Sequence, residues 1–339
     1  MVCSSERWSW SAGNEQEIYH DLAAEDVAFS RSMSARVLAV IPTYLPQREH
    51  LGLLCTDIAE QVDHILLVDN STFNQAWLHE LTAAKISVEV LGTNVGIAAA
   101  QNKGVQYAEK QGFDFVLFLD QDSRPTRGMV KALVDGYHAL MKQGLPVAAV
   151  GPATYMQSPD TLEPFYTTSR WGLGSRHCCS PKDQVEVAYL HASGTLVCTR
   201  IFSRVGLLAE NLFIDMVDME WCFRARKQGY LCFGLCRALL QHQVGEVYRP
   251  LSLKKMPQLS VHAPLRGYYQ VRNIVLLMRG RCASPMLLCH YFLRRVLCRF
   301  LAQLVFAGNR RERLMLFVKG LMHGLQGIEG PYKSFSKKI

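Results

Sequence analysis

The sequence predicts an α/β fold with a mostly parallel sheet, followed by a C-terminal amphipathic helical region. Short apolar runs alternate with helical patterns over residues 37–150, and the pattern is helical from residue 266 onward. The 339 residues are 49% hydrophobic and 19% charged, which allows a sizeable core and excludes a disordered chain. The sequence has neither a fixed-period repeat nor an apolar stretch of about 20 residues, so a solenoid and a transmembrane transporter are excluded.

The predicted strands are short and rich in Val, Ile or Leu, as strands buried on both faces of a parallel sheet are. They are VLAVI (37–41), HILLV (64–68), ISVEVL (86–91), FVLFL (115–119) and VAAVG (147–151). Helices are expected between them at 97–111 and 127–143, closed by Gly112 and Gly144. The later expected elements are loops or short edge strands at 152–187, a strand at 188–198 and a helix at 217–228.

Positive charge is concentrated near the C-terminus. Residues 266–339 hold 14 Lys/Arg and 2 Asp/Glu, a balance of +12, whereas residues 1–265 hold 23 and 27, a balance of −4. We therefore expect four parts, which are a peripheral or disordered extension (1–36), an α/β domain (37–245), a connector (246–265) and a basic helical region (266–339). The extension has no signal-peptide pattern, and translation could start at Met1 or Met33.

The basic region contains two amphipathic stretches, at 286–305 and 310–325. The apolar residues at helical spacing in the first are Leu288, Phe292, Val296, Leu297, Phe300, Leu301, Leu304 and Val305, opposite Arg294, Arg295 and Arg299. The second places Arg310, Arg311, Arg313 and Lys319 beside Leu314, Phe317 and Leu321. This pattern predicts helices lying on an anionic membrane surface, and ordinary helices packed on the domain are the alternative.

The eleven cysteines form no CxxC pair, and the Cys232-x3-Cys236 spacing lacks a partner cluster at zinc spacing. They are expected to be reduced, mostly packed thiols of a cytosolic protein.

Polar residues follow four consecutive predicted strands, where ligands bind in open parallel sheets. They are Pro42-Thr43-Tyr44, Asp69-Asn70-Ser71, Thr93-Asn94-Val95-Gly96 and Asp120-Gln121-Asp122-Ser123. The first strand is not followed by GxGxxG, and GxxxxGK[ST] is absent from the sequence, so another nucleotide geometry is required.

Each cluster suits part of a nucleotide. Tyr44 could lie against a base, Asp69 could accept a hydrogen bond from a base N–H, and Asn94 with Gly96 could admit a ribose. Ordinary turn chemistry is the alternative for each of them taken alone.

Two groups of carboxylates and one histidine are candidates for metal binding and proton transfer. Asp120-x-Asp122 at a strand end could bind Mg²⁺ or Mn²⁺, which would neutralise a diphosphate leaving group, and a solvated capping loop is the alternative. Asp215, Asp218 and Glu220 surround a helix start, where one of them could deprotonate an acceptor hydroxyl or all could simply complement the helix dipole. His242 is a candidate metal or phosphate ligand, or a structural histidine.

Over residues 37–330 the chain resembles the family 2 glycosyltransferases, whose fold is the GT-A nucleotide-diphosphosugar type. The motifs that carry the resemblance are VIPTY, LLVDNST, GTNVGIAAAQNKG, FLDQDS, ASGTLV, FIDMVDMEWCFRARKQGY and HQVG. Within that superfamily, LDQDS, FIDxVDxEW and HAPLRGYYQVRN look like bacterial rhamnosyltransferases.

The resemblance implies roles for matching positions. Donor-binding residues would be Thr43, Tyr44, Asp69, Asn94, Gly96, Asn102, Asp120, Arg266 and Arg272. The metal ligands would be Asp120, Asp122 and His242, with Mg²⁺ or Mn²⁺ as cofactor. The base of an inverting displacement would be Asp218, although Val217 replaces the family's Glu, which leaves Glu220 and Asp215 in reserve. Arg224, Arg266 or Arg272 would assist the departing diphosphate.

The implied activity is transfer of a deoxyhexose, L-rhamnose from dTDP-L-rhamnose, to a lipid-linked glycan in O-antigen or cell-surface polysaccharide synthesis. The alternative acceptor is a small glycolipid, as in rhamnolipid synthesis. The enzyme would be cytoplasmic and peripheral to the inner face of the plasma membrane. A nucleic-acid-binding protein using the basic region is the alternative from another class, but its aromatic residues follow the apolar helix face, so no nucleic-acid partner is expected.

Overall fold

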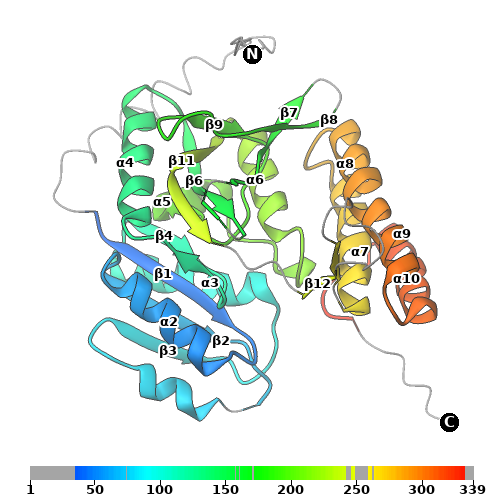
Figure 1. Cartoon of the computed structure of the whole chain (residues 1–339), viewed down its shortest axis with the longest axis horizontal. Helices are drawn as coiled ribbons and strands as arrows, with labels where there is room; N and C mark the ends of the chain where they lie inside the picture. The colour runs from blue at the N-terminus through cyan, green and yellow to red at the C-terminus, as the bar shows by residue number, and fades with distance from the viewer. Residues whose placement is uncertain are drawn as a thin grey trace.

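A computed structural model describes residues 35–332 except residues 74, 157, 160, 170–171, 242–245, 249–258 and 262. The chain forms an α/β body with a layer of C-terminal helices along one side (Figure 1). The extension at 1–34 and His242 lie outside the described residues.

The first half of the sheet is parallel, as predicted. Its strands are β1 (Val37–Thr43), β2 (His64–Asp69), β3 (Ile86–Val90) and β4 (Phe115–Phe118), in the order β3-β2-β1-β4. Thr43 at the end of β1 pairs with Asp69 at the end of β2, so the polar residues that follow these strands meet at one edge. The predicted strands lie within one or two residues of those observed.

Helices pack on this sheet. They are α2 (Arg48–Ala59), α3 (Ile97–Gln111) and α4 (Met129–Lys142), with a 3₁₀ helix at Ala76–Leu81. The predicted bounds of α3 are confirmed, because Gly112 takes the left-handed conformation (φ 69°) that closes its C-terminus. Gly104 lets α3 approach β1, since a Cβ there would lie 2.3 Å from a methyl of Val40.

The second half of the sheet mixes directions. Its strands are β5 (Arg124–Pro125), β6 (Val147–Tyr155), β9 (Gln184–Val187), β10 (Leu196–Cys198) and β11 (Leu231–Gln241). Strand β10 runs antiparallel between β4 and β6. The strand predicted at 188–198 is wrong over most of its length, because residues 191–195 form a turn in which the Thr195 N–H donates to Ala192 O.

Two cysteines correct the prediction of reduced thiols. Cys178, after the hairpin β7 (Phe165–Ser169) and β8 (Gly172–Arg176), forms a disulfide with Cys236 of β11, with the Cα atoms 5.7 Å apart. The partners are 58 residues apart in the sequence, so only the folded chain brings them together. The other cysteines within the described ranges are thiols outside this disulfide, and burial raises the pKa of Cys55 to about 11.

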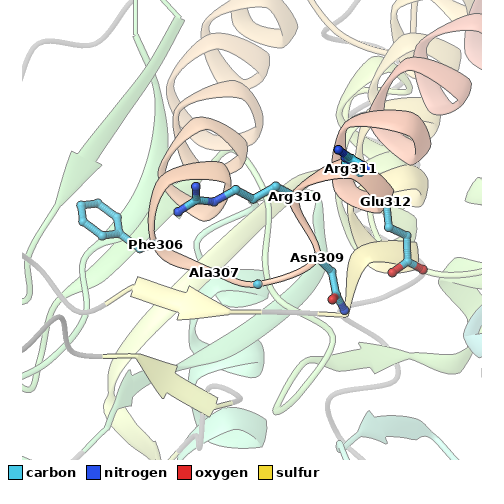
Figure 2. A pocket seen from close by; sticks show the side chains of 7 residues that line it. Phe306, Ala307, Asn309, Arg310, Arg311 and Glu312 are labelled. Atoms are coloured by element: carbon cyan, nitrogen blue, oxygen red, sulfur yellow. The ribbon is translucent and has the colours of Figure 1, made fainter.

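The remaining helices carry the site and the basic region. They are α5 (Thr199–Val205), α6 (Val217–Lys227), α7 (Pro264–Gly280), α8 (Pro285–Tyr291), a π-helix (Phe292–Leu297), α9 (Cys298–Phe306) and α10 (Arg310–Gln326), with a 3₁₀ turn at Glu210–Leu212. Residues 307–309 join α9 to α10 (Figure 2). Within the predicted connector, β12 (Glu246–Tyr248) pairs with β13 (Leu259–Val261). In the part of the chain described, no helix is long and apolar enough to cross a membrane.

Helix α7 packs closely against α10. A Cβ on Gly320 would lie 2.6 Å from Tyr268 O, and a Cβ on Gly324 would lie 2.8 Å from Arg272 O. These two glycines, four residues apart, therefore make the groove into which α7 fits.

Candidate active site at the carboxyl edge of the sheet

Asp69 is fully buried at the end of β2. Its Oδ1 accepts hydrogen bonds from Thr43 Oγ1 (3.2 Å), from the Ser71 N–H (3.1 Å) and from Ser71 Oγ (2.6 Å). Its Oδ2 has no hydrogen-bond partner among the described residues, although it is buried. A buried acceptor without a donor is costly, so Oδ2 is suited to a donor supplied by a ligand.

Tyr44 follows Thr43, which donates to this carboxylate, and Tyr44 is 45% exposed. Its backbone is held by Gln121, whose Oε1 accepts from the Tyr44 N–H (2.8 Å) and whose Nε2 donates to Tyr44 O (3.3 Å). The loop after β1 is thereby tied to the loop after β4. The exposed ring is available to a planar ligand group, and its contact with a base stays a prediction.

Asn94 and Gly96 serve the protein itself. Asn94 Oδ1 accepts from Asn70 Nδ2 (3.1 Å) and from the Gly96 N–H (3.0 Å), which makes a local turn. Gly96 has a φ of 91°, and a Cβ there would lie 2.6 Å from Phe213 O. The close approach that Gly96 permits is therefore to the Phe213 backbone, and the prediction that Gly96 makes room for a ribose is not supported.

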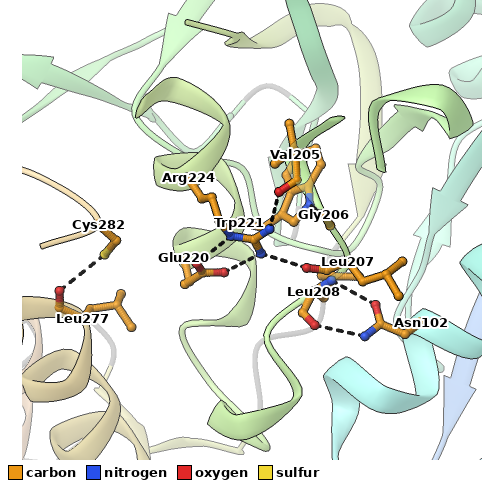
Figure 3. A network of polar contacts seen from close by, with 10 residues as sticks. All are labelled: Asn102, Val205, Gly206, Leu207, Leu208, Glu220, Trp221, Arg224, Leu277 and Cys282. Carbon is orange, nitrogen blue, oxygen red and sulfur yellow. Dashed lines mark hydrogen bonds and ion pairs between the residues drawn. The ribbon is translucent and has the colours of Figure 1, made fainter. Parts of the chain in front are cut away.

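Asn102 also differs from the prediction. It is buried in α3, donates to Leu208 O (2.9 Å) and Glu210 Oε1 (2.8 Å), and accepts from the Leu208 N–H (2.9 Å) (Figure 3). All the polar atoms of its amide are thus used to hold the segment that leads toward α6, and none is left for a donor.

Asp120 and Asp122 are half-buried in the loop after β4. The Ser123 N–H donates to Asp120 O (3.0 Å), and the Asp120 N–H donates to Ser193 Oγ (3.2 Å). Within the described ranges, no group of three or more His, Cys, Asp or Glu side chains is placed to hold a metal ion. Two carboxylates at an open edge fit Mg²⁺ or Mn²⁺, which commonly keep their other positions for water and substrate phosphates.

The segment His191–Thr195 connects this loop to Asp218. Ser193 Oγ accepts from the Asp120 N–H and shares a hydrogen bond with Ser123 Oγ (2.5 Å). The N–H of the preceding residue, Ala192, donates to Asp218 Oδ2 (3.2 Å). The ASGTLV motif (192–197) contributes to the family resemblance, but its pattern indicates no role for Ala192 or Ser193. Strand β10 and helix α5 separate them from α6 along the chain, so their contact with Asp218 could be recognised only after folding.

Asp218 lies in the first turn of α6, with its side chain 24% exposed. Its Oδ1 accepts from the Met219 N–H (2.8 Å), and its Oδ2 lies 3.8 Å from His191 Nδ1. Loss of hydration lowers the pKa of His191, but the nearby charge of Asp218, with the charges of Glu163 and Asp120, outweighs this effect and raises that pKa. The site thus pairs an accessible carboxylate with an imidazole that favours its charged form.

The two reserve carboxylates are occupied. Asp215 pairs with Arg266, whose Nε lies 3.1 Å from Oδ1, and burial raises the Asp215 pKa while Arg266 lowers it in part. Both Glu220 oxygens accept from Arg224 at 2.8 Å, and Arg224 also donates to Leu207 O at 2.8 Å (Figure 3). Of the three carboxylates near this helix start, Asp218 is therefore the one without an arginine partner among the described contacts.

Arg272 is fully buried in α7 and faces the protein interior. It donates to Gly330 O, to Leu212 O (2.8 Å) and to Asn273 Oδ1 (2.9 Å). Asn273 in turn donates to the carbonyls of residues 212, 214 and 215, at 2.8–3.0 Å. The predicted donor-binding role of Arg272 is not supported, because this pair holds the segment before α6 and so positions Asp218.

The observed fold, with a partly parallel sheet and a carboxylate-rich carboxyl edge, is that of a GT-A glycosyltransferase. A family model described as glycosyl transferase family 2 matches residues 39–181. The dTDP-rhamnosyl transferase RfbF of Shigella flexneri is 30% identical over 303 residues, which cover 88% of this chain and 97% of that protein. The chain belongs to family 2 of the glycosyltransferases.

Solved structures share the fold at low sequence identity. GalNAc-T7, crystallised with UDP, GalNAc and Mn²⁺, has a TM-score of 0.55 and 12% identity, and the match covers 94% of this chain and 66% of that one. S. aureus TarS in complex with UDP-GlcNAc has a TM-score of 0.51 and 16% identity, and the match covers 86% of this chain and 81% of that one. The family membership identifies the chain as a glycosyltransferase, and these structures add that the GT-A fold extends over most of it.

Proposed function

We propose that the enzyme transfers L-rhamnose from dTDP-L-rhamnose to a hydroxyl group of a glycan acceptor. The similarity to RfbF over nearly its whole length supports this donor. The observation that carries the proposal is the continuous edge of hydrogen-bonded groups from Asp69, through Tyr44 and Gln121, to Asp120, Ser193 and Asp218. A nucleotide, a diphosphate and an acceptor hydroxyl could be held along this edge in that order.

In this proposal Asp69 Oδ2 accepts the N3–H of the pyrimidine, and the Tyr44 ring lies against the base. Asp218 removes the proton of the acceptor hydroxyl, whose oxygen forms a bond to the anomeric carbon. The bond from that carbon to the diphosphate oxygen breaks with inversion, and the leaving group departs as dTDP. His191, 3.8 Å from Asp218, would add positive charge at the same edge when it is protonated.

Asp120 and Asp122 would hold Mg²⁺ or Mn²⁺ against the diphosphate, and the metal would neutralise the charge that develops there. The Mn²⁺ of GalNAc-T7 supports this cofactor class by analogy of fold. His242 stays a predicted further ligand.

We further propose that the acceptor is a lipid-linked glycan of O-antigen or cell-surface polysaccharide synthesis, with a small glycolipid as the alternative. Such an acceptor would place the enzyme at the inner face of the plasma membrane. The excess of positive charge in the basic helical region supports a contact with anionic lipid.

A donor screen tests the proposal. Purified full-length protein with Mg²⁺ is mixed with dTDP-L-rhamnose, UDP-glucose, UDP-GlcNAc or GDP-mannose, and nucleotide-sugar hydrolysis and thermal shift are measured. We expect dTDP-L-rhamnose to give the largest shift and the fastest hydrolysis. Preference for a UDP-hexose would overturn the rhamnose assignment and leave the family unchanged.

A further inference from the structure

The outer face of α10 is apolar, although it is not packed against the described part of the protein. Five side chains on it are 45–59% exposed. They are Leu314, Met315, Val318, Met322 and Leu325, here called the apolar stripe. At 3.6 residues per turn they fall within about 100° of the helix circumference. Exposed apolar patches of this kind usually mark a contact surface.

The stripe matches the apolar face predicted for this helix only in part, because it includes Leu314 but not Phe317 or Leu321. Phe317 stacks on Phe300 with ring centroids 3.9 Å apart, and Leu321 packs on the core. Arg313 is buried and donates to Gln303 Oε1 (2.9 Å), while Lys319 donates to the Tyr332 hydroxyl (3.2 Å). Helix α10 therefore uses one apolar face for packing and carries a second, opposite one.

Neighbouring elements extend this surface. Leu301 and Val305 of α9 are more than half exposed and lie four residues apart. Leu293 of the π-helix, about two turns before Leu301, is also more than half exposed. Helix α9 contacts α10, so these residues belong to the same helical layer (Figure 1). The exposed apolar area is thus larger than one helix.

The helical layer is rich in positive charge. Residues 266–332 hold eleven Lys/Arg, of which Arg272 and Arg313 are buried, and two Asp/Glu, which gives a net charge of +9. Arg310 and Arg311 are exposed at the start of α10, where Arg310 reaches back to Val305 O (2.9 Å) beside Phe306 (Figure 2). Exposed apolar side chains combined with arginines match the acyl chains and anionic headgroups of a lipid monolayer.

We infer that the apolar stripe of α10 inserts into an anionic lipid surface. A second copy of the chain fits this face less well, because a symmetric dimer would bring together two regions that each carry a net charge of +9.

The helical layer that carries this face also contacts side chains near the active site. Arg295 of the π-helix donates to the Tyr166 hydroxyl (2.6 Å), and Tyr166 stacks on Tyr189, whose ring contacts His191 edge-on.

The helical layer is therefore in contact with the side chains next to Asp218. Resting on the proposed function, this contact places the acceptor side of the catalytic edge beside the lipid surface, where a lipid-linked glycan would arrive.

Vesicle flotation of the full-length protein tests the inference. The vesicles are phosphatidylcholine alone or phosphatidylcholine with about one third phosphatidylglycerol, at low salt. The wild type should float with the anionic vesicles. The double variant Val318→Ser/Met322→Ser should have a partition coefficient at least about tenfold lower. The matched control Leu53→Ser/Val90→Ser changes two exposed apolar residues elsewhere and should float as the wild type does.

Three results would overturn the inference. They are a wild type that stays unbound, a stripe variant that floats like the wild type, and a wild-type dimer in light scattering that the stripe variant loses. Thermal melting checks that both variants fold. Hydrolysis of dTDP-L-rhamnose without vesicles should be equal in all three proteins, and its absence from the wild type would count against the proposed function and not against lipid binding.

Discussion

Replacing Asp69 by Asn should weaken nucleotide binding with little change in shape. The Asn carbonyl can still accept from Thr43 and Ser71, as Asp69 Oδ1 does. The new NH₂ group replaces Oδ2, the buried atom without a partner, and would face the base N3–H donor to donor. A hydrogen bond to a charged group contributes about 1.5–3 kcal/mol, so Kd for dTDP should rise about 10- to 150-fold.

Isothermal titration of dTDP measures this effect. The matched control is Asp63→Asn, which changes a carboxylate that accepts from the Val37 N–H at the opposite end of β1 (2.7 Å) and should leave Kd unchanged. N3-methylated dTDP lacks the N3–H, so it should bind the wild type and Asp69→Asn equally. An unchanged Kd for dTDP in Asp69→Asn would refute the role of Oδ2.

Three other changes test the rest of the edge. Asp218→Asn should lower kcat about 10²- to 10⁴-fold in a transfer assay while donor Kd is kept, and wild-type turnover would exclude Asp218 as the base. Gly96→Ala should lower the free energy of unfolding by about 2–5 kcal/mol in urea titration, because φ is 91° and the Cβ would meet Phe213; a loss below the measurement error would contradict this packing. For His191→Gln, the sign follows from the raised pKa of His191. The charged imidazole stabilises the fold at pH values below its unfolded pKa, and this stabilisation is lost as pH rises through the folded pKa. Urea titrations from acid to alkaline pH should therefore show the wild type gaining stability over the variant toward acid pH, and a pH-independent difference would contradict the pairing with Asp218.

Three predicted donor-binding residues have structural contacts that the sequence does not reveal. Gly96, Asn102 and Arg272 match positions that the family resemblance assigns to the donor, yet each is used to hold the segment before α6. Asn102 meets Leu208 across 106 residues, and Arg272 meets Gly330 across 58. No spacing in the chain signals such contacts.

His191 shows the converse case. Its neighbours in the chain gave no reason to single it out, whereas the fold brings Asp218, Glu163 and Asp120 near enough to raise its pKa. The amphipathic pattern of the last helices predicted an interfacial surface. Leu301, Val305 and Leu314 are exposed, in line with the pattern, whereas Phe317 of the predicted face is packed.

By itself, the sequence determined what depends on near neighbours. Hydrophobic periodicity predicted the parallel strands and α3, and Gly112 marked the end of that helix. Because Asp69, Asp120 and Asp122 follow parallel strands, they lie at one edge of the sheet. The tertiary structure decided which polar groups are satisfied by the protein and which are left for a ligand, because that depends on partners far along the chain. It also joined Cys178 to Cys236 and left the apolar stripe of α10 exposed, since both follow from how whole elements pack.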